Sequence, residues 1–231
     1  PLLSRTAKER YVKVMKQLVV LNAGLSNPSS TRLLSEQLAA AVSAQVSKRG
    51  EGLETQIINI NEYTSDLAAV FTTGVYSKRL QATMEQISAA DGLMAATPVF
   101  TASYSGVFKL FMDVLDPKSL LGMPVLIEAT AGSPRHSLVL EYAMRPLFAY
   151  LQTKVVPTGV FAATDDFGAD SELNNRIVRA ATEMAEYLVD VKDAVKGFGP
   201  DYSQTKQRSS NTQVSNNVTP FANLLKGHDG S

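Results

Sequence analysis

The chain has 231 residues, 45% of them hydrophobic and 19% charged, which is ordinary for a globular protein and suits one α/β domain with an extension. Lysine plus arginine and aspartate plus glutamate both number 22, so the formal net charge is zero and the basic excess of a nucleic-acid or anionic-membrane binder is missing. There is no cysteine, which excludes thiol catalysis, Fe–S clusters and disulfides, and His136 and His228 are too far apart in the sequence to predict a metal site.

The absence of cysteine fits residence in the cytoplasm. No apolar run approaches the ~18 residues of a membrane span. The polar, mixed stretch from Lys8 to Lys16 is unlike a signal peptide. Residues 1–14 are expected to form an N-terminal arm ahead of a domain over residues 15–196.

Five short apolar runs alternate with helical patterns across that domain. Strands are predicted at residues 17–21, 56–60, 93–96, 123–127 and 158–163. Apolar residues spaced three and four apart predict helices at residues 34–46, 80–87, 107–114, 138–151 and 177–195, and residues 62–76 are expected to form a short helix and a loop over the sheet edge.

This alternation predicts a parallel sheet with right-handed crossovers. The expected architecture is a flavodoxin-like α/β three-layer sandwich, with a five-stranded parallel sheet in the order 2-1-3-4-5. Ligands of such sheets bind where the strand order reverses, which here lies between strands one and three. The loops after strands one, three and four would meet there.

The first of these loops is dense in hydroxyl groups and leads into a helix. Ser26, Ser29, Ser30 and Thr31, together with free amides of the helix, could hold a phosphate dianion. The alternative is that one of them caps the helix and the others fill a turn. Neither a Walker lysine motif nor G-x-G-x-x-G is present, which disfavours a nucleoside triphosphate or a Rossmann-bound dinucleotide.

The other two loops could hold a flat ring. The apolar run of strand three stops at Thr97-Pro98, and Phe100 and Tyr104 follow, although Phe100 could be core and Tyr104 could cap a helix. The loop from Thr130 to Ser133 offers a small backbone that contains a glycine, or it is an ordinary turn. Taken together, the three loops at these strand ends could bind a phosphorylated planar ligand such as flavin mononucleotide (FMN).

Two segments point to contacts outside the domain core. Residues 138–151 are apolar almost all round, whereas a surface helix needs one apolar stripe, so burial by a second subunit in a homodimer or homotetramer is expected. Residues 197–231 form a polar tail, in which Thr219-Pro220 predicts the start of a short docking helix.

Several of these segments resemble the NADPH-dependent FMN reductase family, most closely the flavin reductases of two-component alkanesulfonate-type monooxygenases. The resemblance covers about residues 15–165 and is carried by residues 91–100, 103–109, 129–132, 142–147 and 159–161. Its most specific part is the block from Thr97-Pro98-Val99-Phe100 to Tyr104-Ser105-Gly106.

The resemblance implies roles for specific residues. The hydroxyls of the first loop would bind the FMN phosphate, and Tyr142 would lie at a subunit interface near the flavin. Residues implied to surround the isoalloxazine ring are Pro98, Val99, Phe100, Thr101 and Ser103 on one side and Thr130, Ala131, Gly132 and Ser133 on the other. Family members often have tyrosine in place of Phe100, and this chain lacks their arginine in the first loop, for which Arg32 is a candidate replacement.

The implied function is hydride transfer from NADPH or NADH to FMN, with reduced FMN supplied to a monooxygenase. The flavin carries the chemistry, so the protein need supply no catalytic acid, base or metal. Arg135 and His136 are candidates for the nicotinamide nucleotide's phosphate. The alternatives are a reductase of quinones, azo dyes or metal oxyanions that keeps its FMN, a flavodoxin-like electron carrier, for which a neutral chain is unusual, and a phosphate-binding module without flavin.

Overall fold

The computed structural model describes residues 15–168 and 172–189. The predicted N-terminal arm, the last helix beyond residue 189 and the predicted tail with its docking helix lie outside the described residues. The strands are β1 (Met15–Asn22), β2 (Gly52–Asn59), β3 (Gly92–Phe100), β4 (Ser103–Tyr104), β5 (Pro124–Ala131), β6 (Lys154–Val155) and β7 (Val160–Ala163). The α-helices are α1 (Ser30–Lys48), α2 (Thr64–Thr73), α3 (Lys78–Ala89), α4 (Gly106–Val114), α5 (Arg145–Tyr150) and α6 (Glu172–Leu188), and the shorter helical turns are η2 (Ile60–Tyr63), η3 (Pro134–His136), η4 (Leu140–Met144) and η5 (Thr164–Gly168).

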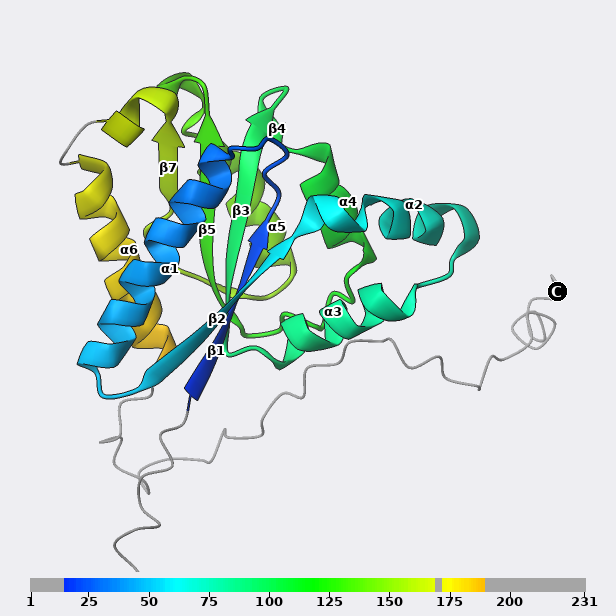
Figure 1. Ribbon diagram of the computed structural model, residues 1–231, viewed down its shortest axis with the longest axis horizontal. Helices are drawn as coiled ribbons and strands as arrows, with labels where there is room; N and C mark the ends of the chain where they lie inside the picture. The colour runs from blue at the N-terminus through cyan, green and yellow to red at the C-terminus, as the bar shows by residue number, and fades with distance from the viewer. Residues whose placement is uncertain (1–14, 169–171, 190–231) are drawn as a thin grey trace, which may run out of the picture.

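A parallel sheet in the order β2-β1-β3-β5-β6 forms the middle layer (Figure 1). The predicted order 2-1-3-4-5 is confirmed, with β5 as the fourth strand. The predicted number of strands is wrong, because the sheet has seven. The fifth strand is divided into β6 and β7, which both pair with β5, and β4 adds a short antiparallel partner to β3.

The interruption of the fifth strand has a local cause. Residues 156–159 of that strand stand opposite only Leu126 and Ile127 of β5, since Val155 pairs with Val125 and Val160 with Glu128. The surplus residues include Pro157, which has no N–H to give to a ladder. Strand pairing therefore stops after β6 and resumes at β7.

Strand β3 runs further than its apolar core suggested. It continues through Pro98 to Phe100, where the sequence had indicated the start of a loop. Pairing of β3 with β1 ends at Ala96, whereas pairing with β5 continues to Pro98. Pro98 thus lies on a stretch with one open edge, a place where a strand tolerates proline.

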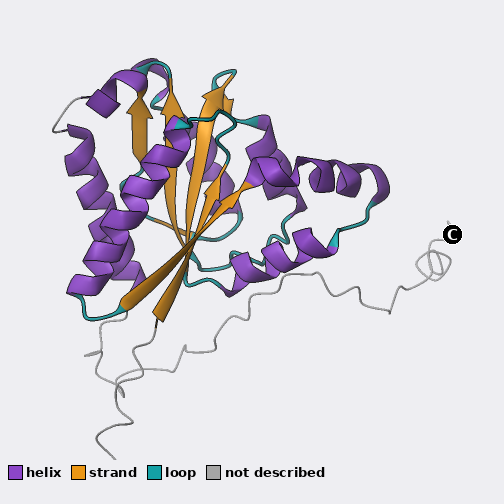
Figure 2. Ribbon diagram, in the orientation of Figure 1, coloured by secondary structure: helices purple, strands orange, loops and turns teal. Residues whose placement is uncertain are grey.

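Helices cover both faces of the sheet (Figure 2), and alternate residues of the strands pack against the two helical layers. Leu18, Val20 and Leu126 pack with α1 and α6, and their neighbours Val19 and Leu21 pack on the opposite side with α3, α4 and α5. The predicted apolar rows are confirmed as buried on α1 (Leu34, Leu38, Val42 and Val46) and on α6 (Ile177, Ala181, Met184 and Leu188). The fold is therefore the three-layer sandwich expected from the sequence.

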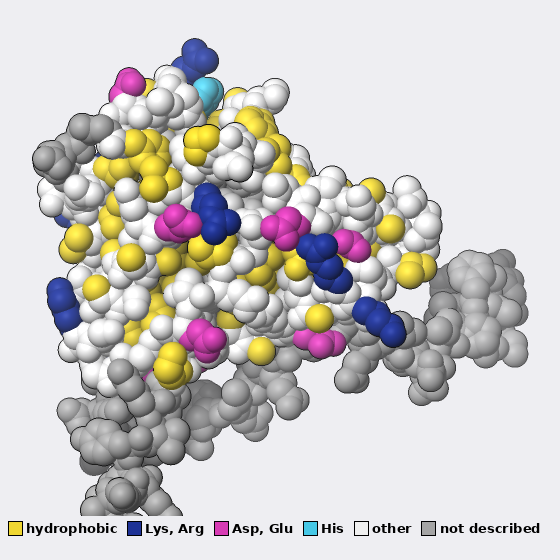
Figure 3. Space-filling model, viewed as in Figure 1, with side chains coloured by type: hydrophobic (Ala, Val, Ile, Leu, Met, Phe, Trp, Pro, Cys, Tyr) yellow, Lys and Arg dark blue, Asp and Glu magenta, His cyan; other side chains and the backbone are white. Residues whose placement is uncertain are grey.

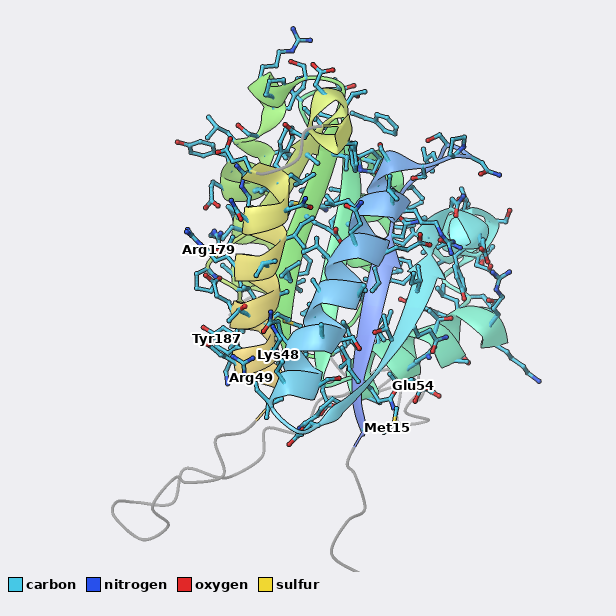
Figure 4. All side chains as sticks on the ribbon, turned by 60° about the vertical axis from the view of Figure 1, so that its left-hand side comes forward. Met15, Lys48, Arg49, Glu54, Arg179 and Tyr187 are labelled. Atoms are coloured by element: carbon cyan, nitrogen blue, oxygen red, sulfur yellow. The ribbon has the colours of Figure 1, made fainter. Side chains whose placement is uncertain are left out.

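Helices α1 and α6 lie side by side over one face of the sheet (Figure 4). Arg49, just after α1, donates to Glu186 of α6 at 3.2 Å and joins the C-terminal ends of the two helices. On the face shown in Figure 3, charges of both signs are interspersed with apolar atoms. In the described part of the chain, no helix combines the length and the hydropathy needed to cross a bilayer.

Candidate functional site

A cavity of about 470 Å³ opens at the C-terminal ends of β1, β3, β5 and β7. The loop after β1 and the start of α1 form one wall, the end of β3 forms another, and the end of β5 with the turn after β7 forms a third. The lining residues are Leu25, Ser26, Ser30, Thr31, Pro98, Val99, Phe100, Thr130, Ala131, Gly132 and Thr164. The three predicted loops therefore do meet at the point where the strand order reverses.

The wall at the start of α1 is shaped by a helix cap. The Ser29 hydroxyl accepts a hydrogen bond from the amide of Arg32 at 3.2 Å, so Ser29 is the residue that caps α1. A Cβ at Gly24 would lie 2.1 Å from the Ser29 Oγ, so a larger residue there would displace the Ser29 hydroxyl from its capping position. With the cap provided by Ser29, the hydroxyls of Ser26 and Ser30 remain for the cavity, which Thr31 also lines.

Strand β3 ends in a hairpin that forms the second wall. Thr101 and Ala102 have φ values of 48° and 65°, the left-handed conformation of a tight two-residue turn between β3 and β4. Phe100, just before the turn, is 47% exposed and belongs to the cavity wall rather than to the core. Ser105 caps α4 by accepting from the amide of Phe108, so the capping role considered for Tyr104 is wrong.

The third wall has room for a ligand. A Cβ built on Gly132 would meet nothing within 4 Å, so the small size of this lining residue leaves free space beside the cavity. The following residue, Ser133, accepts from the amide of Arg135 at 3.5 Å and caps η3. Next to it, the Arg135 Nε lies 3.2 Å from the His136 Nε2 at the exposed rim of this loop.

Behind these walls, α1 is joined to β5 by polar side chains that are buried. The hydroxyls of Thr31 and Thr130 are 2.7 Å apart, and both residues line the cavity. One helical turn deeper, Ser35 lies 3.0 Å from the Glu128 Oε1. Burial raises the pKa of Glu128 from 4.5 to about 8, against a smaller lowering by the hydrogen bond to Ser35.

Among the described residues, those that line the cavity carry no charge. Arg32, the candidate replacement for the missing arginine, is engaged elsewhere. It pairs with Glu36 at 2.8 Å and donates to Asn59 at 3.3 Å. The cavity therefore offers hydroxyls, the N-terminus of α1 and an apolar hairpin end.

Most of the predicted site residues are brought together in the cavity. Four are not part of its lining: Ser29 and Ser133 serve as helix caps, Thr101 is in the hairpin turn, and Ser103 is in β4. Tyr142 is 79% exposed on η4 and is not among the lining residues. The predicted contacts of all these residues with FMN stay predictions.

Leu25 and Thr164 line the cavity although the sequence analysis did not single them out. Thr164 could have been found, because it follows β7 at the same sheet end as the other three loops. Leu25 stands between Gly24 and Ser26, and its apolar side chain gave no signal in a loop chosen for its hydroxyls.

Comparison with known proteins agrees with this geometry. Residues 15–168 match the family model described as NADPH-dependent FMN reductase. The NADH-dependent FMN reductase SfnF of Pseudomonas fluorescens (strain Pf0-1) is 33% identical over 169 residues, which cover 73% of this chain and 87% of that protein. The FMN reductase (NADPH) of Pseudomonas aeruginosa is 33% identical over 175 residues, 74% of this chain and 91% of that protein.

Solved structures show the same relationship. An oxidoreductase from Corynebacterium diphtheriae is 53% identical with a TM-score of 0.73, over 75% of this chain and 97% of that one. The apo form of the NADH:FMN oxidoreductase EMOB is 25% identical with a TM-score of 0.65, over 74% of this chain and 88% of that one. This chain belongs to the NADPH-dependent FMN reductase family.

Proposed function

We propose that the cavity binds FMN, with the phosphate at the start of α1 and the isoalloxazine ring between the β3 hairpin and the loop after β5. The observation that carries this proposal is the division of one cavity into a hydroxyl-rich end and an apolar end. Ser30 and Thr31 begin α1, where amides and the helix dipole favour an anion, and Ser26 lies in the loop before it.

The other end of the cavity suits a flat ring. Pro98, Val99 and Phe100 present apolar surface, and Ala131 and Gly132 leave room opposite them. A cavity of about 470 Å³ is within the usual range of roughly 300–1,000 Å³ for sites that bind cofactors and small molecules. The residues present therefore fit FMN in charge, polarity and size.

Bound FMN supplies the hydride acceptor for a reduced nicotinamide. The described residues of the cavity wall include no titratable side chain, so their contribution is to bind and orient the two rings. Arg135 and His136, at the exposed rim after β5, are the candidates for the nicotinamide nucleotide's phosphate. The two relatives from Pseudomonas are an NADH-dependent and an NADPH-dependent enzyme, and we propose NAD(P)H for this chain.

The neutral wall also bears on what happens to FMN after reduction. A phosphate held by hydroxyls and helix amides, with no lysine or arginine in the described wall, should bind with moderate affinity. Moderate affinity favours release of reduced FMN to a separate flavin-dependent monooxygenase. A sub-nanomolar dissociation constant for FMN would contradict this part of the proposal.

We further propose that the protein acts as a homo-oligomer in the cytoplasm. Leu138, Tyr142 and Tyr150 lie within residues 138–151 and remain exposed after the chain has folded. Exposed apolar side chains gathered on one element favour burial by a second copy. Tyr142 would then lie within an interface, as its resemblance to interface tyrosines implies.

The test is a titration of flavin-free protein with FMN and excess NADPH or NADH in the absence of oxygen. If many equivalents of FMN lose their visible absorbance per subunit, FMN is a released substrate and the proposal stands. If one equivalent is reduced and stays bound, the protein is a reductase with fixed FMN and another acceptor. If FMN binds but neither nicotinamide reduces it, the reductase assignment fails and an electron carrier remains.

A further inference from the structure

Glu128 is a buried carboxyl group that the proposed hydride transfer does not use. It lies in β5, its side chain is fully buried, and its strand neighbours Ala96 of β3 and Val160 of β7 offer it no charge. Because side chains alternate along a strand, Glu128 faces the same layer as Leu126 and Thr130, the layer that contains α1. It therefore lies directly behind the cavity wall.

The hydrogen bonds around Ser35 indicate which form of Glu128 is present. The Ser35 Oγ is 3.0 Å from the carbonyl oxygen of Thr31, four residues earlier in α1, and 3.0 Å from the Glu128 Oε1. A hydroxyl has one hydrogen, and in helices serine commonly donates it to the carbonyl four residues back. With that hydrogen given to Thr31, the contact with Glu128 is satisfied when a protonated Glu128 donates to the Ser35 Oγ.

The remaining oxygen of Glu128 supports the neutral form. Its Oε2 is buried and has no hydrogen-bond partner in the described part of the chain. An unpaired oxygen of a neutral carboxyl group costs far less free energy in a protein interior than an unpaired carboxylate. Burial is also the main reason that the pKa of Glu128 is raised to about 8.

Charged groups on the packed helices are paired elsewhere or, like Arg179 of α6, exposed to solvent. On α1, Arg32 and Glu36 pair with each other at 2.8 Å. On α6, Arg176 donates to the carbonyl of Phe161 and pairs with Glu172, while Glu183 accepts two bonds from Thr158. Strands β3 and β7 contain no titratable side chain. These positions leave Glu128 without a cation to stabilise its charged form.

Two levels of hydrogen bonds between α1 and β5 connect this carboxyl group to the cavity. Glu128 is hydrogen-bonded to Ser35, whose hydroxyl also contacts the carbonyl of Thr31. The hydroxyls of Thr31 and Thr130 are 2.7 Å apart. Thr31 and Thr130 both line the cavity. Loss of the proton on Glu128 should therefore disturb the position of the first turn of α1 against β5. The phosphate is proposed to bind at this turn.

We propose that Glu128 is a positioning residue for the FMN phosphate: its neutral carboxyl group donates to Ser35, fixes the first turn of α1 against β5 and keeps negative charge out of the wall behind the phosphate. FMN then binds to the form with protonated Glu128, and ionisation of Glu128 weakens binding. This inference rests on the proposed function and adds proton-linked control of flavin affinity to it.

The expected linkage has a definite sign. Bound phosphate, a dianion above its second pKa of about 6, makes ionisation of Glu128 harder, so the complex keeps the proton to higher pH than the free protein. Above the pH at which Glu128 ionises in the free protein, the dissociation constant for FMN should rise by up to about tenfold per pH unit. Below it, the dissociation constant should stay constant.

The experiment measures FMN binding by quenching of flavin fluorescence, from about pH 7 to about pH 9, for wild type, Glu128→Gln and Glu36→Gln. The side-chain amide of the Glu128→Gln variant keeps the shape and can still donate to Ser35, so affinity at neutral pH should be unchanged and the rise at alkaline pH should disappear. Glu36→Gln removes an exposed carboxylate of the same helix and should keep the wild-type profile. Equal pH profiles for wild type and Glu128→Gln would overturn the inference.

A second measurement uses wild type alone and does not depend on the folding of a variant. Calorimetric titration with FMN at about pH 8.5, in two buffers of different protonation enthalpy, should show uptake of protons on binding. Binding without proton uptake overturns the role of Glu128 and leaves the reductase proposal intact. Failure of FMN to bind at every pH overturns both.

Discussion

A substitution at Ser30 can distinguish an effect on phosphate binding from an effect on the stability of α1. It is the first residue of α1, it lines the cavity, and the first turn of α1 contains no acidic residue. In Ser30→Asp, the carboxylate would stabilise the helix N-terminus by up to ~1 kcal/mol but would repel the phosphate. We expect unchanged or higher stability of the flavin-free protein and a dissociation constant for FMN that is about 100-fold higher or more.

The matched control is Ser30→Asn, which has nearly the shape of aspartate without its charge. Its FMN affinity should stay within about tenfold of wild type, because one neutral hydrogen bond contributes about 1 kcal/mol. Fluorescence titration gives the affinities and chemical denaturation the stabilities. Wild-type affinity in Ser30→Asp would place the phosphate elsewhere.

Glu128 should give the flavin-free protein a characteristic pH dependence of stability. Its pKa is 4.5 in its ordinary state and about 8 in the folded protein. Between these two pH values the folded protein keeps a proton on Glu128 that the unfolded chain has lost. The resulting contribution to stability is fully present below about pH 4.5 and is lost as pH rises to about 8. At pH 7 the cost to wild type relative to acid pH is about 3 kcal/mol.

Glu128→Gln has no proton to lose, so it should lack this slope. Urea denaturation of both proteins at about pH 5 and about pH 8 measures the difference, which should favour the variant more at the higher pH. If the difference between the two proteins is the same at both values, Glu128 is not the neutral buried acid described above.

At the residue scale, the sequence predicted that hydroxyl side chains lie at the site, but not which hydroxyl has which role. A cluster of hydroxyls before a helix indicated both a cap and a ligand site, and the structure assigns the cap to Ser29 and places Ser30 and Thr31 on the cavity. Which serine does which depends on the backbone angle at the helix start, and the pattern of residues does not encode it. Glu128 gave no sequence signal, because an acid in a strand is marked only by its burial.

The β3–β4 hairpin gives a test at the scale of an element. Thr101 and Ala102 both adopt positive φ, a conformation that asparagine and glycine adopt at less cost. Replacing the pair by Asn-Gly should raise the free energy of unfolding by about 1 kcal/mol, since less strain is stored in the turn. Denaturation by urea measures the change.

Ala68→Gly provides a control of opposite sign. Ala68 is exposed within α2, where glycine should lower stability by about 1 kcal/mol. A loss of stability in the Asn-Gly variant as well would mean that the side chain of Thr101 contributes more than the turn conformation costs.

At this scale, long periodic patterns were predicted well and interruptions were not. The apolar rows of α1 and α6 were found because each helix buries one stripe. Residues 138–151 were expected to be one helix, but the structure divides them into the π-helix η4 and α5. Pro146 stands in the first turn of α5, where its missing N–H is tolerated, and the widened turn just before it leaves no periodic signature of its own.

For the whole molecule, the alternation of strands and helices was sufficient to predict the order of the sheet and the place of the site. Parallel strands joined by right-handed crossovers allow few orders, and all loops after the strands lie at one end. The sequence could not show that β3 would pass through Pro98, because that depends on β1 ending at the level of Ala96 while β5 continues. Thr101 and Ser103 therefore belong to a hairpin rather than to an open loop, and their predicted contacts with FMN stay predictions.

The last test concerns assembly. Tyr142 is 79% exposed within the apolar residues 138–151, and Phe71 is a comparable side chain, 56% exposed, on the separate helix α2. Helices α5 and α2 are labelled in Figure 1. A lysine in an apolar interface loses its hydration, so Tyr142→Lys should shift the protein towards the monomer, by about 2 kcal/mol or more of association free energy. Sedimentation velocity over a range of concentrations measures this shift, and Phe71→Lys should sediment like wild type. If Tyr142→Lys also sediments like wild type while remaining folded, the copies associate through another face, and the apolar segment at residues 138–151 then requires a different partner.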